Sequence, residues 1–85
     1  MRKIIFTKQA EEELLDFQEN TPKLFDKIKI LIENIQETPF TGLGKPEALK
    51  HQFKGFWSRR INIEHRLVYK VETDEIIVIQ CKGHY

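Results

Sequence analysis

The 85-residue sequence has a single cysteine, Cys81, so no disulfide can form within the chain. Apolar runs are short as well: Ile76–Ile79 is typical, and none is long enough to cross a bilayer. Ile4–Phe6 is also too short for the core of a secretion signal, and Lys8 breaks this apolar stretch. We therefore expect one domain, residues 1–85, in the reducing cytoplasm and without a membrane partner.

Metal-binding patterns and two common catalytic motifs are also missing. The three histidines and Cys81 show neither paired Cys-x-x-Cys nor His-x₃-His spacing, so no zinc site is expected. The sequence contains no Gly-x-Ser-x-Gly elbow, and the Gly42/Gly44 pair is too short for a phosphate-binding loop. We therefore expect no metal and no cofactor, and no serine-hydrolase or P-loop chemistry.

The charges are unevenly distributed, although the formal net charge is only +1. Five acids and no base lie between Glu11 and Glu19, whereas Lys45–Lys70 holds seven bases and two acids. Aromatic residues lie among these bases, which is the pattern expected of a nucleic-acid partner. A solvated surface on which charges happen to segregate is the structural alternative.

Hydrophobic periodicity predicts an α+β domain. Lys3–Thr7 is short and β-branched and predicts a strand, and helical spacing follows over Lys8–Glu19 and Pro22–Glu37. Thr21 and Pro22 form a helix-start signal, and Pro39 ends the second helix. The period then changes to two, which predicts strands at Leu49–Phe53, Trp57–Ile63, Leu67–Glu72 and Ile76–Cys81, with a hairpin turn at Thr73-Asp74. We expect two N-terminal helices on one face of a mostly antiparallel sheet of about five strands, leaving the other face for a site.

The basic half contains the residue types that metal-free RNA cleavage requires. Such cleavage needs a base for the 2′-hydroxyl, a cation for the charged phosphorane and an acid for the departing 5′-oxygen. Glu47 lies in a basic stretch, Arg66 lies in a predicted strand and His84 is near the C-terminus. Arg60 has the same strand parity as Arg66, whereas its neighbour Arg59 must point to the opposite face.

Each of these residues also has a structural interpretation. Glu47 suits a surface turn, Arg66 suits an ion pair with Glu64, and the residues around His84 suit a frayed end to which Gly83 adds freedom. His65 has Ile63 and Leu67 on its own strand face, which favours a buried, hydrogen-bonded histidine over a catalyst. Residue spacing alone leaves these alternatives open.

The second half of the sequence resembles the YoeB-type toxins, a branch of the RelE/ParE superfamily. Five segments carry the resemblance, in the family's order and with similar gaps: TPF (38–40), GKPEALKH (44–51), GFWSRRI (55–61), EHRLVY (64–69) and the final His84-Tyr85. The resemblance implies a RelE-like, microbial-ribonuclease-like fold. It also implies a type II toxin that cuts translated mRNA in the ribosomal A site by 2′-hydroxyl attack, leaving a 2′,3′-cyclic phosphate.

Residue by residue, the resemblance makes Glu47 the general base, Arg66 the phosphorane-stabilising cation and His84 the general acid. Tyr85 would position the substrate or support the site. By the same resemblance, Lys50 and Arg60 would bind phosphate, and Arg59 is a weaker candidate for contacts with ribosomal RNA. The implied partners are the ribosome, mRNA and a cognate YefM/Phd-like antitoxin; a homodimer is compatible with the resemblance, although no interface can be read from the sequence.

Two other functions fit a small basic domain of this kind. One is a non-catalytic relative that inhibits gyrase, and the other is a nucleic-acid-binding module that acts only by occupancy. The combination of Glu47, Arg66, His84 and Tyr85 favours the ribonuclease, because neither alternative needs an acid–base set.

Overall fold

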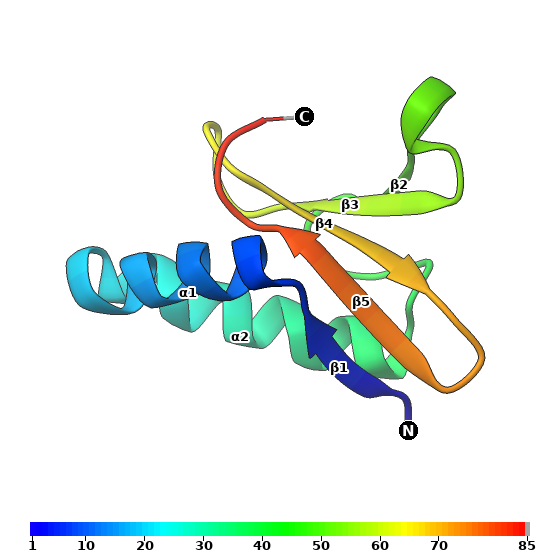
Figure 1. The fold of residues 1–85 in the computed structure, drawn as a ribbon, viewed down its shortest axis with the longest axis horizontal. Coiled ribbons are helices and arrows are strands. Elements are labelled where there is room, and N and C mark those ends of the chain that lie inside the picture. Colours follow the sequence, from blue (N-terminus) through cyan, green and yellow to red (C-terminus); the bar gives the residue numbers. More distant parts are fainter. Residues whose placement is uncertain (85) are drawn as a thin grey trace.

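Two helices lie against one face of a five-stranded sheet in the computed structural model, which describes residues 1–84 (Figure 1). The elements in chain order are β1 (Lys3–Phe6), α1 (Lys8–Asn20), α2 (Pro22–Glu37), β2 (Glu47–Ala48), the 3₁₀ helix η1 (His51–Phe53), β3 (Phe56–Arg60), β4 (Arg66–Val71) and β5 (Glu75–Gln80). The strand order is β1-β5-β4-β3-β2, and only the β1–β5 pair is parallel. The predicted α+β fold is confirmed.

Both helices form where the sequence predicts them. The Thr7 hydroxyl accepts a hydrogen bond from the Ala10 amide at 3.2 Å and so caps α1. α2 begins at Pro22 as expected, because proline at the first helical position has no amide hydrogen to satisfy. Within the described residues, neither helix is long and apolar enough to cross a membrane.

Strand alternation divides the sheet into a core face and an open face. Leu67 and Tyr69 of β4, with Ile76 and Val78 of β5, join the buried cluster that the helices cover. From α2, Ile28, Leu31 and Ile35 pack into the same cluster. Residues of the opposite parity on β3 and β4 therefore face away from the helices.

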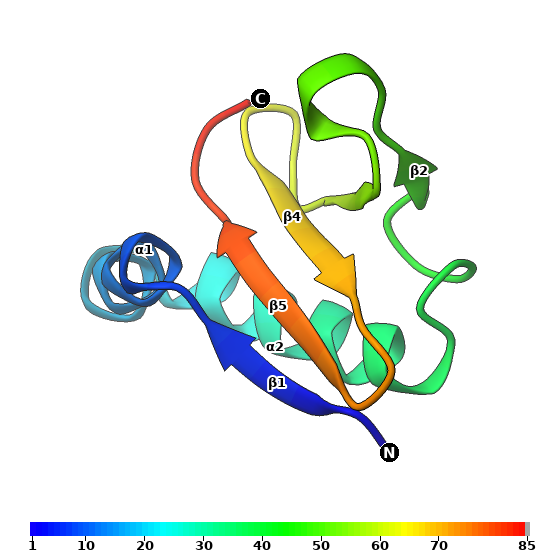
Figure 2. The same ribbon diagram turned by 45° about the vertical axis from the view of Figure 1, so that its right-hand side comes forward.

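The prediction of a strand at Leu49–Phe53 is wrong. β2 covers only Glu47–Ala48, and residues 51–53 form η1. β2 and β3 are antiparallel neighbours, and the last bond between them runs from the Leu49 amide to the Phe56 carbonyl at 2.9 Å. The chain must reverse direction between these two residues, so the segment after Leu49 forms the connection (Figure 2).

The predicted strand Trp57–Ile63 also ends too late, because β3 stops at Arg60. Arg60 pairs with Arg66, so the chain must turn between them. The Asn62 side chain makes that turn: its Oδ1 accepts from the amides of Glu64 and His65 at 2.9 and 2.7 Å. The hairpin turn at Thr73-Asp74 is confirmed; the Glu72 amide donates to the Glu75 carbonyl at 2.8 Å.

Candidate active site

One cavity on the open face brings together most of the predicted site residues. Its volume is about 280 Å³, and it is lined by Lys45, Glu47, Ser58, Arg60, Arg66 and His84. Glu47, Arg60 and His84 are exposed, so a ligand in solvent can reach them. One carboxylate, one imidazole and three cations thus surround a space in which an anion would be attracted to the walls.

Sheet register places these side chains next to one another. Glu47 on β2 pairs with Ser58 on β3, and Arg60 on β3 pairs with Arg66 on β4. Ser58 and Arg60 lie two residues apart and therefore project from the same face of β3. The predicted parity of Arg60 with Arg66 is confirmed.

Gly44 allows the loop before β2 to lie against β3. Its carbonyl accepts the Arg60 amide at 2.6 Å, and its φ is +77°. A Cβ at this position would lie 3.0 Å from the Arg60 carbonyl oxygen and 3.1 Å from Leu31, so any other residue would push the loop outward. This close approach keeps Lys45 beside Arg60.

The guanidinium of Arg66 is oriented by the turn that precedes its strand. Its Nη1 donates to the Asn62 carbonyl at 2.8 Å and to the His65 carbonyl at 3.2 Å. These bonds fix the plane of a group that can hold two phosphate oxygens at once. No ion pair between Arg66 and Glu64 occurs within the described residues, so the structural alternative for Arg66 is not observed.

The segment after β5 is held at several points before it reaches His84. Glu13 Oε1 of α1 accepts from the amides of Cys81 and Lys82 at 2.8 and 3.2 Å. The Lys82 ammonium donates to Asp16 at 2.8 Å; this hydrogen bond is the main cause that lowers the pKa of Asp16. Cys81 and Lys82 are therefore hydrogen-bonded to α1, in contrast to the frayed end that their position near the C-terminus favours.

Cys81, the first residue of this segment, is buried. Burial raises the pKa of its thiol to about 12, and the charge of Glu13 acts in the same direction. The thiol is therefore neutral at physiological pH and is a poor nucleophile.

The expectation that Arg59 contacts ribosomal RNA is wrong. Arg59 is fully buried and faces the helices, on the opposite side of β3 from Arg60. All five of its donors are used: Nε on the Tyr69 hydroxyl, Nη1 on Asn34 Oδ1 and the Leu43 carbonyl, and Nη2 on the carbonyls of Thr38 and Thr41, at 2.7–3.0 Å. Its charge lies beyond the C-terminus of α2, where the helix dipole is negative. Burial raises the pKa of Tyr69, whose hydroxyl donates to the Pro39 carbonyl at 2.6 Å.

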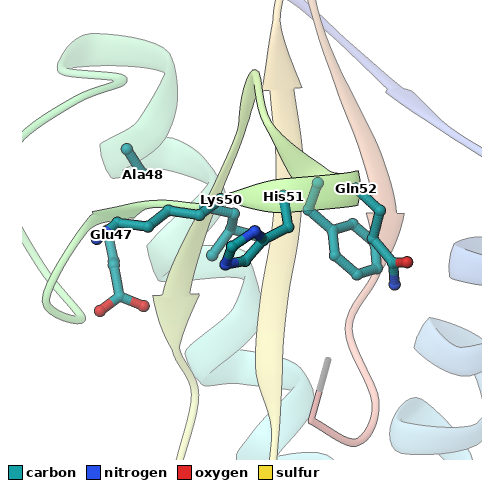
Figure 3. A pocket seen from close by; sticks show the side chains of 7 residues that line it. Glu47, Ala48, Lys50, His51 and Gln52 are labelled. Atoms are coloured by element: carbon teal, nitrogen blue, oxygen red, sulfur yellow. The ribbon is translucent and has the colours of Figure 1, made fainter.

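Lys50 does not line the cavity of about 280 Å³ that holds Arg60, Arg66 and His84. It lines a neighbouring hollow of about 780 Å³ formed by residues 47–53 (Figure 3). In Figure 3 the Glu47 carboxylate and the Ala48 side chain point to opposite sides, as successive strand residues do. Glu47 borders both spaces, so Lys50 lies beside the cavity rather than in it.

Two cavity residues, Lys45 and Ser58, were not among the predicted site residues, although the segments that contain them were singled out. Both carry a recognisable signal: Lys45 lies two residues before Glu47, and Ser58 has the parity of Arg60. His65 is a hydrogen-bonded histidine with only 12% of its side chain exposed, as predicted, although Ile63 is 90% exposed and does not cover it. The role expected for Tyr85 falls on a residue outside the described range.

The sequence and the structure of the chain were compared with those of known proteins, and both comparisons match one family over nearly the whole chain. The profile of the YoeB-like toxins of bacterial type II toxin–antitoxin systems matches residues 6–85. Toxin YoeB of Synechocystis sp. is 48% identical over 83 residues, covering 98% of this chain and 96% of the relative. The YoeB dimer from Staphylococcus aureus superposes with a TM-score of 0.93 at 45% identity, covering 99% of this chain and 98% of that one. The YoeB–YefM complex from Staphylococcus aureus gives 0.91 at 44% identity, over 100% and 99% of the two chains.

Proposed function

Because the chain belongs to the YoeB-like toxin family of bacterial type II toxin–antitoxin systems, we propose that it is an endoribonuclease that cuts mRNA in the ribosomal A site. The observation that supports this most strongly is the cavity in which Glu47, Arg60, Arg66 and His84 meet. These residues come from three strands and the C-terminal segment, and an acid–base pair and cations are the set that 2′-hydroxyl attack requires.

In the proposed reaction, the Glu47 carboxylate removes the proton of the 2′-hydroxyl. The 2′-oxygen then forms a bond to phosphorus, and the bond from phosphorus to the 5′-oxygen breaks. His84 gives its proton to the departing 5′-oxygen. The products are a 2′,3′-cyclic phosphate and a 5′-hydroxyl end, and the scheme needs no metal ion.

The cations have separate tasks in this scheme. Arg66, oriented through Nη1, stabilises the charge on the phosphorane oxygens. Arg60 and Lys45 line the same cavity and attract the scissile phosphate. Lys50 lies in the adjoining hollow and binds a neighbouring phosphate of the same strand.

The proposed dependence on the ribosome follows from the shape of the site. The cavity is small and its acid and base are exposed, so few contacts are available to orient a flexible RNA. An mRNA already ordered in the A site brings its 2′-hydroxyl to the base with the orientation entropy already lost. The proposed partners are therefore the ribosome and mRNA. A YefM-like antitoxin and a second copy of the chain are proposed because the Staphylococcus aureus relatives form such assemblies.

The test is to add purified protein to ribosomes that hold a defined mRNA with an open A site, and then to map the mRNA ends. We expect one cut within the A-site codon, ending in a 2′,3′-cyclic phosphate, and free mRNA cut much more slowly. The isosteric Glu47→Gln variant is the control, because it cannot accept the 2′-hydroxyl proton. Intact mRNA would overturn the proposal, and gyrase inhibition or binding by occupancy would then be assayed instead.

A further inference from the structure

Gly83, the residue before His84, is held on both sides by the start of β4. Its amide donates to Nδ1 of His65 at 2.8 Å, and its carbonyl accepts from the amide of Arg66 at 3.0 Å. Gly83 has a φ of +82°, which other residues rarely adopt, so the two bonds hold a conformation that favours glycine. The C-terminal segment and the turn between β3 and β4 run side by side in both ribbon views (Figures 1 and 2). The sequence predicted that Gly83 adds conformational freedom before His84, whereas two hydrogen bonds restrain it in the structure.

The bond from the Gly83 amide selects one tautomer of the neutral His65 ring. A backbone amide can only donate, so Nδ1 must accept and can carry no proton. The proton of the neutral ring then lies on Nε2, which is 3.9 Å from the Glu64 carboxylate. His65 is thus required as one particular tautomer.

Further contacts hold the His65 ring and the backbone that carries it. The ring packs edge-on against Phe17 of α1, with centroids 5.1 Å apart and an interplanar angle of 71°. The His65 amide donates to Asn62 Oδ1 at 2.7 Å, and its carbonyl accepts from the Ile61 amide at 3.1 Å. The Nδ1 acceptor therefore belongs to a ring that packs against α1 and projects from a hydrogen-bonded turn.

We propose that His65 is a positioning residue, which holds Gly83 through Nδ1 and thereby keeps His84 in the cavity beside Arg66. The bonds from Glu13 and Asp16 act on Cys81 and Lys82, farther from the reacting end. The bond from His65 acts on the residue adjacent to His84, where a small displacement moves the imidazole directly. The role of His84 as the acid is part of the proposed function, so this inference rests on it.

Two variants of matched shape separate the hydrogen bond from the packing. His65→Asn places an oxygen acceptor where Nδ1 lies, and His65→Leu places a methyl group there; both lose the ring that contacts Phe17. We expect kcat for cleavage on programmed ribosomes to fall about tenfold in His65→Leu and to stay within about twofold of the wild type in His65→Asn. KM should be unchanged in both, because neither variant removes a phosphate-binding cation. Equal losses of kcat in the two variants would overturn the proposal and leave His65 a packing residue.

A second measurement does not depend on activity. In the wild type at mildly alkaline pH, ¹⁵N NMR should show His65 protonated at Nε2 only, with the Gly83 amide protected from hydrogen exchange. Protection should persist in His65→Asn and be lost in His65→Leu. A proton on Nδ1, or a Gly83 amide that exchanges rapidly in the wild type, would overturn the proposal even if His65→Leu fails to fold. A protein that shows the predicted NMR result but cuts no mRNA would instead refute the proposed function alone.

Discussion

Replacement of Arg59 by methionine should remove much of the stability of the domain. Methionine fills similar space but offers no donor, so five acceptors each lose one hydrogen bond, three of them carbonyls of the segment between α2 and β2. Asn34 Oδ1 and the Thr41 carbonyl keep a second donor. Each such bond contributes about 1 kcal/mol net. Water can reach Thr41 and Leu43, which are exposed, and would recover part of this loss. We therefore expect a loss of about 3–5 kcal/mol.

That loss is large for a chain of this length. At about 0.05–0.15 kcal/mol per residue, 85 residues give a free energy of unfolding of roughly 4–13 kcal/mol. The midpoint temperature should fall by at least about 12 °C, because 1 kcal/mol corresponds to roughly 4–8 °C in a small domain. Urea and thermal unfolding followed by circular dichroism would measure both quantities.

Arg60→Met is the matched control, since it makes the same change one residue away on the opposite face. Arg60 is exposed, so its stability should change by no more than about 0.5 kcal/mol, while cleavage should weaken. A loss below about 1 kcal/mol in Arg59→Met, or equal losses in the two variants, would show that the buried guanidinium does not hold the loop as described.

Further changes test the site and the buried thiol. Glu47→Gln should lower the cleavage rate on ribosomes by about 10²–10⁴-fold with unchanged ribosome binding in sedimentation, and lost binding would contradict its role as the base. Arg66→Lys should lose at least about tenfold in single-turnover cleavage, because an ammonium cannot hold two phosphate oxygens in one plane; full activity would refute that role. Removal of His84 and Tyr85 should abolish cleavage while circular dichroism stays unchanged, and an active truncation would exclude His84 as the acid. The pKa of Cys81 is raised from 9.0 to about 12, so the folded state keeps a proton that the unfolded state loses above pH 9. Stability should therefore fall as pH rises through this window, and less steeply in Cys81→Ala; parallel curves for the two proteins would contradict this.

The helices could be predicted from the sequence because their signals are local, whereas the acid–base roles of Glu47 and His84 rest on the family resemblance and stay a prediction. Apolar spacing defines α1 and α2, and the alternation of side chains along a strand assigns Arg59 and Arg60 to opposite faces. Parity does not tell which face meets the helices, so the sequence could not show that Arg59 is buried. That outcome depends on Asn34 and the loop carbonyls, which come close only in the folded chain.

The errors in the second half arose where antiparallel pairing decides the conformation. The segment after Leu49 alternates like a strand but must reverse the chain before β3. Asn62 is a residue type that favours turns and could have predicted the end of β3. Ile61 and Ile63 on either side favour a strand, so the alternating pattern was extended through it. The hydrogen bonds that restrain the segment before His84 could not be predicted, because Glu13 and Cys81 lie almost seventy positions apart in the sequence.

The parallel pairing of β1 with β5 also constrains how the protein is made. Lys3 lies opposite Glu75 and Phe6 opposite Val78, so the first strand in the described chain can pair only after the fifth has been synthesised. Contacts this distant in sequence form slowly, because a long loop must close before they stabilise anything. During translation the sheet cannot be completed until β5 has left the ribosome, and the cavity that needs His84 forms later still. A nascent chain therefore exposes most of its sequence before the cavity can assemble, so the order of synthesis alone delays completion of the site.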